Sequence, residues 1–178
     1  MFLKDYYPKL NKKFAKIKFN GIAFESSSIK KNYIFFAIKG NNLDGNNFIP
    51  SVIKKGCKII VTEKNFDEWK NGVLFINTKN IRKLLAQISF SIFKKKPNNL
   101  IAVTGTNGKS SVSDFYYQIL RLNNKKVASI GTLGVRSNNF NLNLFNTTID
   151  PIYLGKILNE LKKRKIENVI MEASSHGL

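Results

Sequence analysis

A glycine-rich loop between an apolar run and a helix-period segment constrains the fold of this chain more than any other feature. The loop reads Gly105-Thr106-Asn107-Gly108-Lys109-Ser110-Ser111, and the apolar run 100–103 before it predicts a buried strand. After the loop, apolar side chains recur at helical spacing on a face that carries Val112, Phe115, Tyr116, Ile119 and Leu120. Strand, glycine loop and helix in this order form the arrangement that a phosphate-binding loop needs.

The residue types within the loop suit phosphate chemistry. Its glycines let backbone N–H groups approach phosphate oxygens without an intervening Cβ, and the following helix N-terminus adds a partial positive charge. The Lys109 ammonium can reach terminal phosphates, and the Ser110 hydroxyl can ligate Mg²⁺. The general pattern asks for glycine where this chain has Val103. A glycine turn with an incidental lysine is the less favoured alternative, because strand, loop and helix all fall where the pattern requires them.

Composition places the chain among globular proteins. With 178 residues and 43% hydrophobic content, it can bury a core as one large domain or two small ones. Its one cysteine, Cys57, excludes an internal disulfide and suits a reducing cytosol, so we expect a cytoplasmic protein. No apolar run approaches the length of a membrane span, and the N-terminus lacks the apolar core of a signal peptide.

The net charge of +19 indicates either anionic ligands or nucleic-acid binding. The lysines are spread along the whole chain, and the dense runs 94–96 and 162–165 each end a predicted helix, where cations complement the helix dipole. This distribution favours a solvated basic surface that attracts a polyanionic substrate. A basic nucleic-acid-binding protein stays an alternative without a recognised motif, and we expect a monomer with neither nucleic-acid nor membrane partners.

The first half of the chain reads as a small α/β domain. Strand and helix patterns occur at 17–24, 33–38, 48–53, 58–62, 73–76 and 81–92, and residues 1–16 form a short helix or a loose arm. Gly56 is a candidate C-cap for the helix at 48–53. The stretch 94–99 runs from lysines through Pro to Asn, as linkers do. We therefore expect one domain over 1–96 and another over 97–178.

The second half predicts the beginning of a doubly wound parallel sheet. Strands are expected at 127–130, 140–145 and 167–171, with a helix that Asp150 caps and Pro151 opens. Ligands of such sheets bind at the carboxyl ends of the strands, where the loops 105–111, 146–150 and 172–177 can meet. Three strands with a phosphate loop are about half of a nucleotide-binding domain. We expect an N-terminal portion of a larger enzyme, with an unusually short gene product as the alternative.

Taken together, the motifs of the chain resemble the Mur ligase family from about residue 17 onward. The residues that carry the resemblance are Phe35-Phe36-Ala37-Ile38-Lys39-Gly40 with Asp44-Gly45 and Phe48-Ile49, Asn146-Thr147-Thr148 with Asp150-Pro151, and Met171-Glu172-Ala173-Ser174-Ser175-His176-Gly177-Leu178. The last two groups are similar to the ligases that add the third amino acid of the peptidoglycan stem peptide. The phosphate loop is shared with folylpolyglutamate synthases, so another P-loop enzyme, such as a ligase of that type or a small kinase, stays an alternative.

The resemblance implies an ATP-dependent amide ligase. ATP would phosphorylate the D-glutamyl carboxylate of a UDP-N-acetylmuramoyl-dipeptide, and the amine of diaminopimelate or lysine would attack the acyl phosphate. It implies a UDP-sugar-binding domain over 1–96 and the first part of the ATP-binding domain over 97–178. Further parts of the family's active site would lie beyond Leu178, so we expect these residues alone to be inactive.

The resemblance also implies roles for individual residues. The loop Gly105 to Ser111 would hold the ATP phosphates, Lys109 and Glu172 would be catalytic, and Ser110 and Glu172 would ligate Mg²⁺. The substrate-binding positions would be Phe24, Ser26, Asn41, Asn42, Leu43, Asn146, Thr147, Thr148 and Ser175. His176 is expected to be structural. The chain has Glu25-Ser26-Ser27 where the family commonly has Asp-Ser-Arg, and Lys30 is a candidate substitute for that arginine.

Overall fold

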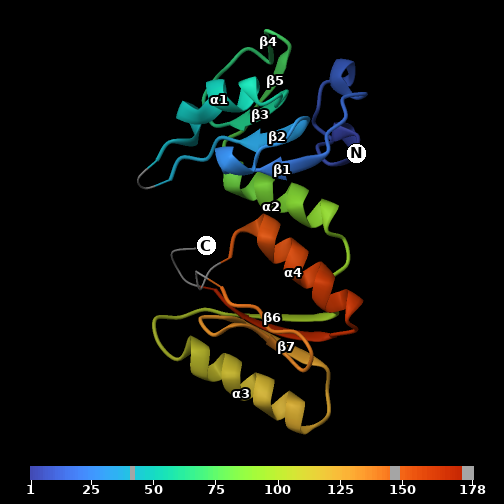
Figure 1. Ribbon diagram of the computed structural model, residues 1–178, viewed down its shortest axis with the longest axis vertical. Helices are drawn as coiled ribbons and strands as arrows, with labels where there is room; N and C mark the ends of the chain where they lie inside the picture. Colours follow the sequence, from blue (N-terminus) through green and yellow to red (C-terminus); the bar gives the residue numbers. More distant parts are fainter. Residues whose placement is uncertain (41–42, 145–148, 174–178) are drawn as a thin grey trace. The chain divides into compact units, whose positions relative to one another are not determined.

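The computed structural model describes residues 1–40, 43–144 and 149–173, which belong to two compact units, Met1–Ile92 and Phe93–Leu178 (Figure 1). Each unit contains a largely parallel sheet with helices, so the α/β class predicted from the sequence is confirmed. The division after Ile92 falls just before the predicted linker 94–99. No helix in the described part of the chain has both the length and the hydropathy that a membrane crossing requires.

The first unit is built on a five-stranded sheet of order β1-β2-β3-β5-β4. Its elements are β1 (Gly21–Ala23), β2 (Tyr33–Phe36), α1 (Ile49–Lys54), β3 (Ile59–Thr62), β4 (Trp69–Lys70), β5 (Val73–Asn77) and α2 (Ile81–Ile92), with the 3₁₀ turns η1 (Leu3–Asp5), η2 (Lys12–Phe14), η3 (Ser26–Ser28) and η4 (Gly45–Phe48). All strands pair in parallel except β4, a short antiparallel edge strand that the sequence pattern did not predict. The arm 1–16 is anchored by the buried side chains of Leu3 and Phe14.

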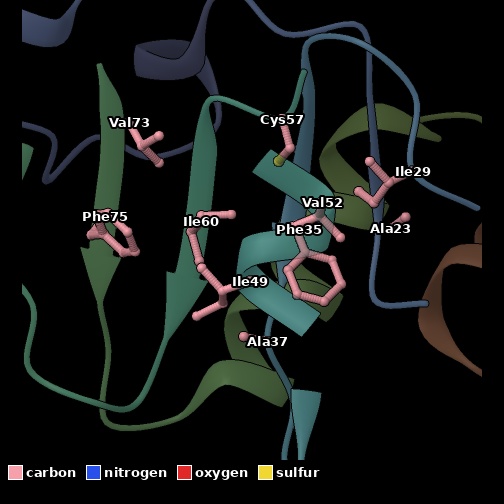
Figure 2. Close-up of a cluster of buried hydrophobic side chains, with 10 residues drawn as sticks. All are labelled: Ala23, Ile29, Phe35, Ala37, Ile49, Val52, Cys57, Ile60, Val73 and Phe75. Atoms are coloured by element: carbon pink, nitrogen blue, oxygen red, sulfur yellow. The ribbon is translucent and has the colours of Figure 1, made fainter. Parts of the chain in front are cut away.

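The core of the first unit lies between this sheet and α1. Figure 2 shows Phe35 from β2 and Ile60 from β3 next to Ile49 and Val52 of α1. The strands are apolar on nearly every residue, because a parallel sheet covered by helices buries both faces. Cys57 is part of this cluster, as expected for a small core residue, and burial raises the pKa of its thiol above 9.0.

The second unit is built on a four-stranded sheet of order β6-β9-β7-β8. Its elements are β6 (Asn99–Val103), α3 (Lys109–Leu122), β7 (Val127–Gly131), β8 (Gly134–Ser137), α4 (Pro151–Lys163) and β9 (Asn168–Glu172). Strands β6, β9 and β7 are parallel, β8 runs antiparallel to β7, and Figure 1 shows α3 and α4 on opposite faces of the sheet. The carboxyl ends of β6 and β9 therefore lie side by side, with Val103 in register with Glu172.

One prediction about burial in this unit is wrong. The run 100–103 was predicted to be a buried strand, but Leu100 and Ile101 are each 39% exposed, because β6 is an edge strand among the described strands. The predicted apolar face of α3 is largely exposed, with Phe115 at 63% exposure, while Ser113 and Tyr117 face inward. The reason is that α3 packs on β6, β7 and β9, with the face that carries Ser113 and Tyr117 buried and the apolar stripe left on the outside.

The segment after β7 also differs from the prediction. Residues 140–144 of the expected strand 140–145 form no strand, and Leu142 makes one isolated bridge to Val135 instead. The strand in this region is β8, which closes a hairpin with β7 through the two-residue turn Thr132 and Leu133. The prediction for α4 is confirmed: the Asp150 carboxylate accepts hydrogen bonds of 2.9 Å from the N–H groups of Ile152 and Tyr153.

Candidate functional site

The glycine-rich loop joins the end of β6 to the start of α3. Gly105 has φ +145° and Gly108 has φ +78°, backbone conformations that residues with a Cβ rarely adopt. Gly108 is the N-cap of α3, and no side chain caps the first turn of this helix. The orphan N–H groups of that turn and the positive end of the helix dipole are thus available to an anion.

Lys109 lies against this loop. Its Nζ donates hydrogen bonds to the carbonyl oxygens of Gly105 at 2.6 Å and Thr106 at 3.2 Å. The side chain is half-buried, so its ammonium is held next to the loop backbone instead of extending into solvent. The Lys109 ammonium, two glycines with positive φ and an uncapped helix N-terminus lie close together, and this arrangement favours binding of a polyphosphate.

Glu172 ends β9 beside this loop and is 8% exposed. Its Oε2 accepts hydrogen bonds from the Ser110 hydroxyl at 2.9 Å and from the Thr132 hydroxyl at 3.0 Å, and its Oε1 accepts one from the Thr132 N–H at 3.2 Å. Three donors from α3 and from the β7–β8 turn therefore orient the carboxylate. The structure brings the predicted residues Ser110 and Glu172 into direct contact.

Gly131 and Thr132 are site residues that the sequence analysis missed. Gly131 ends β7, and a Cβ on it would overlap the Glu172 side chain, so a larger residue here would force the carboxylate to move. Thr132 supplies two of the hydrogen bonds to that carboxylate. The available signal was the Gly-Thr-Leu-Gly turn directly after a predicted strand, at the sheet edge where ligands bind.

A small pocket lies beside Glu172. Its lining includes Ser110, Ser113, Asp114, Ser129, Arg136 and Glu172. Hydroxyl and carboxylate oxygens are the hard ligands that Mg²⁺ prefers, so the contact of Ser110 with Glu172 fits this ion. The described residues contain no group of three or more His, Cys, Asp or Glu that could hold a metal ion. A cation at Ser110 and Glu172 would therefore take further ligands from phosphate and water, as Mg²⁺ does.

The first unit holds three of the predicted substrate-binding residues that the structure describes. Phe24 is half-buried after β1, and Ser26 opens η3, where its carbonyl oxygen accepts a 2.7 Å hydrogen bond from Lys55 Nζ. The sequence analysis proposed Lys30 as a cation for this region, and Lys55 was missed because it follows α1, 29 positions away. Leu43 is 67% exposed, and its carbonyl oxygen accepts a 2.8 Å hydrogen bond from the Gly40 N–H.

Asp44 anchors the turn that contains Leu43. Its Oδ1 accepts hydrogen bonds from the Asn46 side chain at 2.7 Å and the Asn46 N–H at 2.8 Å, and these bonds lower the pKa of Asp44 below 3.8. The Asn46 Oδ1 in turn accepts a 2.7 Å hydrogen bond from the buried Thr62 hydroxyl at the end of β3. The turn is thereby tied to the carboxyl end of a central strand.

The remaining predicted site residues lie outside the described residues. They are Asn41, Asn42, Asn146, Thr147, Thr148 and Ser175, and His176 is outside as well.

Two family descriptions match the chain. Residues 18–91 match "Mur ligase family, catalytic domain", and residues 103–178 match "Mur ligase middle domain". The curated relatives include UDP-N-acetylmuramoyl-L-alanyl-D-glutamate--2,6-diaminopimelate ligase of Rickettsia typhi, which is 39% identical over 95% of this chain and 35% of its own length. The enzyme of the same name from Fusobacterium nucleatum is 38% identical over 90% of this chain and 33% of its own length. The chain thus spans about a third of the length of the curated relatives it matches.

Solved structures show the same fold. A structure of UDP-N-acetylmuramoyl-L-alanyl-D-glutamate--2,6-diaminopimelate ligase superposes with a TM-score of 0.81 at 21% identity, covering 99% of this chain and 36% of that one. The MurF ligase from Thermotoga maritima, solved in complex with ADP, has a TM-score of 0.56 at 20% identity and covers 88% of this chain and 32% of that one. At these identities the likeness concerns the arrangement of strands and helices.

Proposed function

This chain belongs to the Mur ligase family, and on that premise we propose that it binds the UDP substrate and the ATP phosphates of a peptidoglycan-precursor ligase. The reaction we propose for the whole enzyme is addition of 2,6-diaminopimelate to UDP-N-acetylmuramoyl-L-alanyl-D-glutamate. The names of the relatives, at 38–39% identity, support this substrate pair. From the sequence alone, the added amino acid could be either diaminopimelate or lysine.

The observation that carries the proposal is the contact between Ser110 and Glu172 beside the glycine-rich loop. Lys109, the backbone N–H groups of 105–111 and the N-terminus of α3 would bind the terminal phosphates of ATP. Ser110 and Glu172 would hold Mg²⁺, which would neutralise phosphate charge when bound. These residues act through their position and charge, which are the main contributions that a protein makes to phosphoryl transfer.

The chemistry that this charge supports is the formation and use of an acyl phosphate. The D-glutamyl carboxylate oxygen attacks the γ-phosphorus of ATP, and ADP leaves. The amine of the incoming amino acid then attacks the acyl carbon, inorganic phosphate leaves, and the nitrogen loses a proton. Lys109 stabilises the negative charge on the terminal phosphate oxygens during the first step.

The UDP part of the substrate is proposed to bind the first unit. Phe24 and Ser26 follow β1, Leu43 is exposed on its anchored turn, and Lys55 adds a cation at Ser26. The further contacts proposed by resemblance are Asn41, Asn42, Asn146, Thr147, Thr148 and Ser175. A cation and backbone N–H donors near a sheet edge stabilise a bound pyrophosphate through charge-assisted hydrogen bonds.

Two-ligand NMR mapping on the ¹⁵N-labelled chain tests the proposal. Mg²⁺-ATP is expected to shift the amide signals of Gly105, Gly108 and Thr132, and UDP to shift those of Ser26 and Leu43. Each ligand should leave the other set unchanged. If neither nucleotide shifts these signals, while unrelated RNA binds with steep salt dependence, the protein is a nucleic-acid binder and the ligase proposal is wrong.

A further inference from the structure

We propose that the ion pair between Asp114 and Arg136 positions Thr132, and through it the Glu172 carboxylate, at the candidate metal and phosphate site. This inference deepens the proposed function and rests on it. Arg136 and Asp114 are positioning residues here, since neither belongs to the residues assigned to ATP or Mg²⁺.

The ion pair is short and both of its side chains make further contacts. Arg136 Nη1 donates to Asp114 Oδ1 at 2.8 Å, with side-chain exposures of 32% and 27%. The guanidinium carbon lies 4.9 Å from the centroid of the Tyr117 ring, and Tyr117 is 3% exposed. The Gln118 side chain donates to the other oxygen of Asp114. Arg136 is therefore held by two α3 residues at once, by charge and by stacking.

The pair connects two elements that both reach Glu172. Asp114 lies one helical turn after Ser110 on α3, and Ser110 donates to Glu172. Arg136 lies on β8, and the two-residue turn before that strand contains Thr132, which donates to Glu172 twice. The β7–β8 hairpin is thus attached to α3 through Arg136 and to the end of β9 through Thr132.

The hairpin needs this second attachment because β8 is an edge strand. Within the described sheet, β7 is the one strand that pairs with β8. The backbone hydrogen bonds between Val135 and Leu142 tie β8 to the loop after it but do not link it to α3. Without the ion pair, the hairpin would lose its attachment to α3, and the turn that donates two hydrogen bonds to Glu172 would be held less firmly. A carboxylate that ligates a metal depends on such hydrogen bonds for its orientation.

The ion pair also determines which carboxylate in the pocket has no positively charged partner among the described residues and can therefore bind a cation. The two acidic residues that line the pocket are Asp114 and Glu172, and they share it with the Ser110 and Ser113 side chains. Asp114 is neutralised by Arg136, whereas the hydrogen-bond donors to Glu172 given above are uncharged. Removal of the Arg136 charge would create a second anionic group that competes for the cation.

Hydrogen exchange of the Thr132 amide tests the positioning directly and without a ligand. In Arg136→Gln, this amide should exchange about tenfold faster, because the Thr132 to Glu172 bond opens more often. The amides of Ile170 in β9 and Ile60 in the first unit should be unchanged. The charge-swapped double variant Asp114→Arg with Arg136→Asp should restore slow exchange. The matched control is Arg164→Gln, which removes a 2.9 Å ion pair with Glu160 on α4 together with contacts to the Asn139 carbonyl oxygen and the Phe140 ring, and should leave Thr132 as it is.

A second measurement links the pair to the metal. In Arg136→Gln, the Mg²⁺ concentration for half-maximal stimulation of ATP binding should rise about tenfold, the size expected when an orienting group of a metal ligand is lost. ATP binding without Mg²⁺ should not change. Equal loss with and without Mg²⁺, unchanged exchange at Thr132, or faster exchange throughout the second unit would each overturn the inference. Absence of Mg²⁺-dependent ATP binding in the wild-type chain would overturn the proposed function instead, while the exchange rates still decide whether Arg136 holds Thr132.

Discussion

The Ser110 hydroxyl donates a 2.9 Å hydrogen bond to Oε2 of Glu172, although the two residues are 62 positions apart. The contact exists because β6 and β9 are parallel neighbours, so the loop after β6 and the last residue of β9 share one sheet edge. Ligands of parallel α/β sheets bind at this edge.

Gly131→Ala is expected to abolish Mg²⁺-dependent stimulation of ATP binding. The new Cβ would overlap the Glu172 carboxylate and displace it from Ser110. Binding of UDP should be unaffected, because Gly131 belongs to the second unit. Titration calorimetry of both ligands checks this, and a Gly131→Ala variant with normal Mg²⁺ dependence would remove Glu172 from the proposed site.

Lys109→Met is expected to weaken ATP binding by about tenfold or more, the loss typical of a charge-assisted contact to phosphate. The side chain now lies against the carbonyl oxygens of Gly105 and Thr106, where a bound phosphate would be within its reach. Lys125→Met, beyond the opposite end of α3, is the control for loss of one positive charge. Equal effects of the two substitutions would mean that the overall charge attracts ATP and that the loop does not bind it.

Lys55→Ala is expected to weaken UDP binding several-fold, by roughly the contribution of one exposed charge-assisted hydrogen bond. Lys55 reaches the carbonyl oxygen of Ser26, in the segment proposed to hold the diphosphate. Lys30→Ala is the matched control, since Lys30 is the cation that the sequence alone favoured. Calorimetry with UDP distinguishes them: an effect of Lys30→Ala without an effect of Lys55→Ala would reverse the assignment.

Acidification is expected to destabilise the turn around Asp44. Its hydrogen bonds with Asn46 lower the pKa of Asp44 below 3.8 in the folded chain, so its stabilising contribution is present above that value and disappears as the pH falls through the folded pKa. Urea denaturation at pH 5 and pH 3 measures the loss. Lys162 also lowers the pKa of Glu167, so Glu167 adds its own pH dependence to the unfolding free energy. Comparison with Asp44→Asn therefore isolates the contribution of Asp44. An identical pH dependence in Asp44→Asn and wild type would contradict the prediction.

Asp150→Ala is expected to lower the free energy of unfolding of the second unit by about 1 kcal/mol. The substitution removes the acceptor of two 2.9 Å hydrogen bonds from the first turn of α4. Asp150→Asn retains an acceptor and should lose only a few tenths of that amount. Urea denaturation of both variants gives the comparison, and equal losses would show that the charge matters and the hydrogen bonds do not.

Much of the fold could be predicted because local patterns were strong. Val73–Asn77 and Ile81–Ile92 are observed where apolar runs and helical periodicity indicated them, and Asp150 with Pro151 marked the start of α4. The strands β4 and β8 were missed since each is short and gains its stability from one partner strand. The exposure of Phe115 was missed because periodicity identifies an apolar face without saying what covers it.

The sequence by itself determined the chemistry of the candidate site: a glycine loop with Lys109 and Ser110, and an acidic residue, Glu172, at the end of a strand. Spacing along the chain suffices for the loop, because strand, loop and helix start are local features, whereas the role expected of Glu172 rests on the resemblance to the Mur ligase family. Only the tertiary structure decided which groups surround that carboxylate. Thr132 and Gly131 lie against it because of strand pairing, Arg136 pairs with Asp114 on the helix packed beside it, and Lys55 reaches Ser26 within the first unit. Such contacts depend on strand order and register, which pairing between distant segments sets.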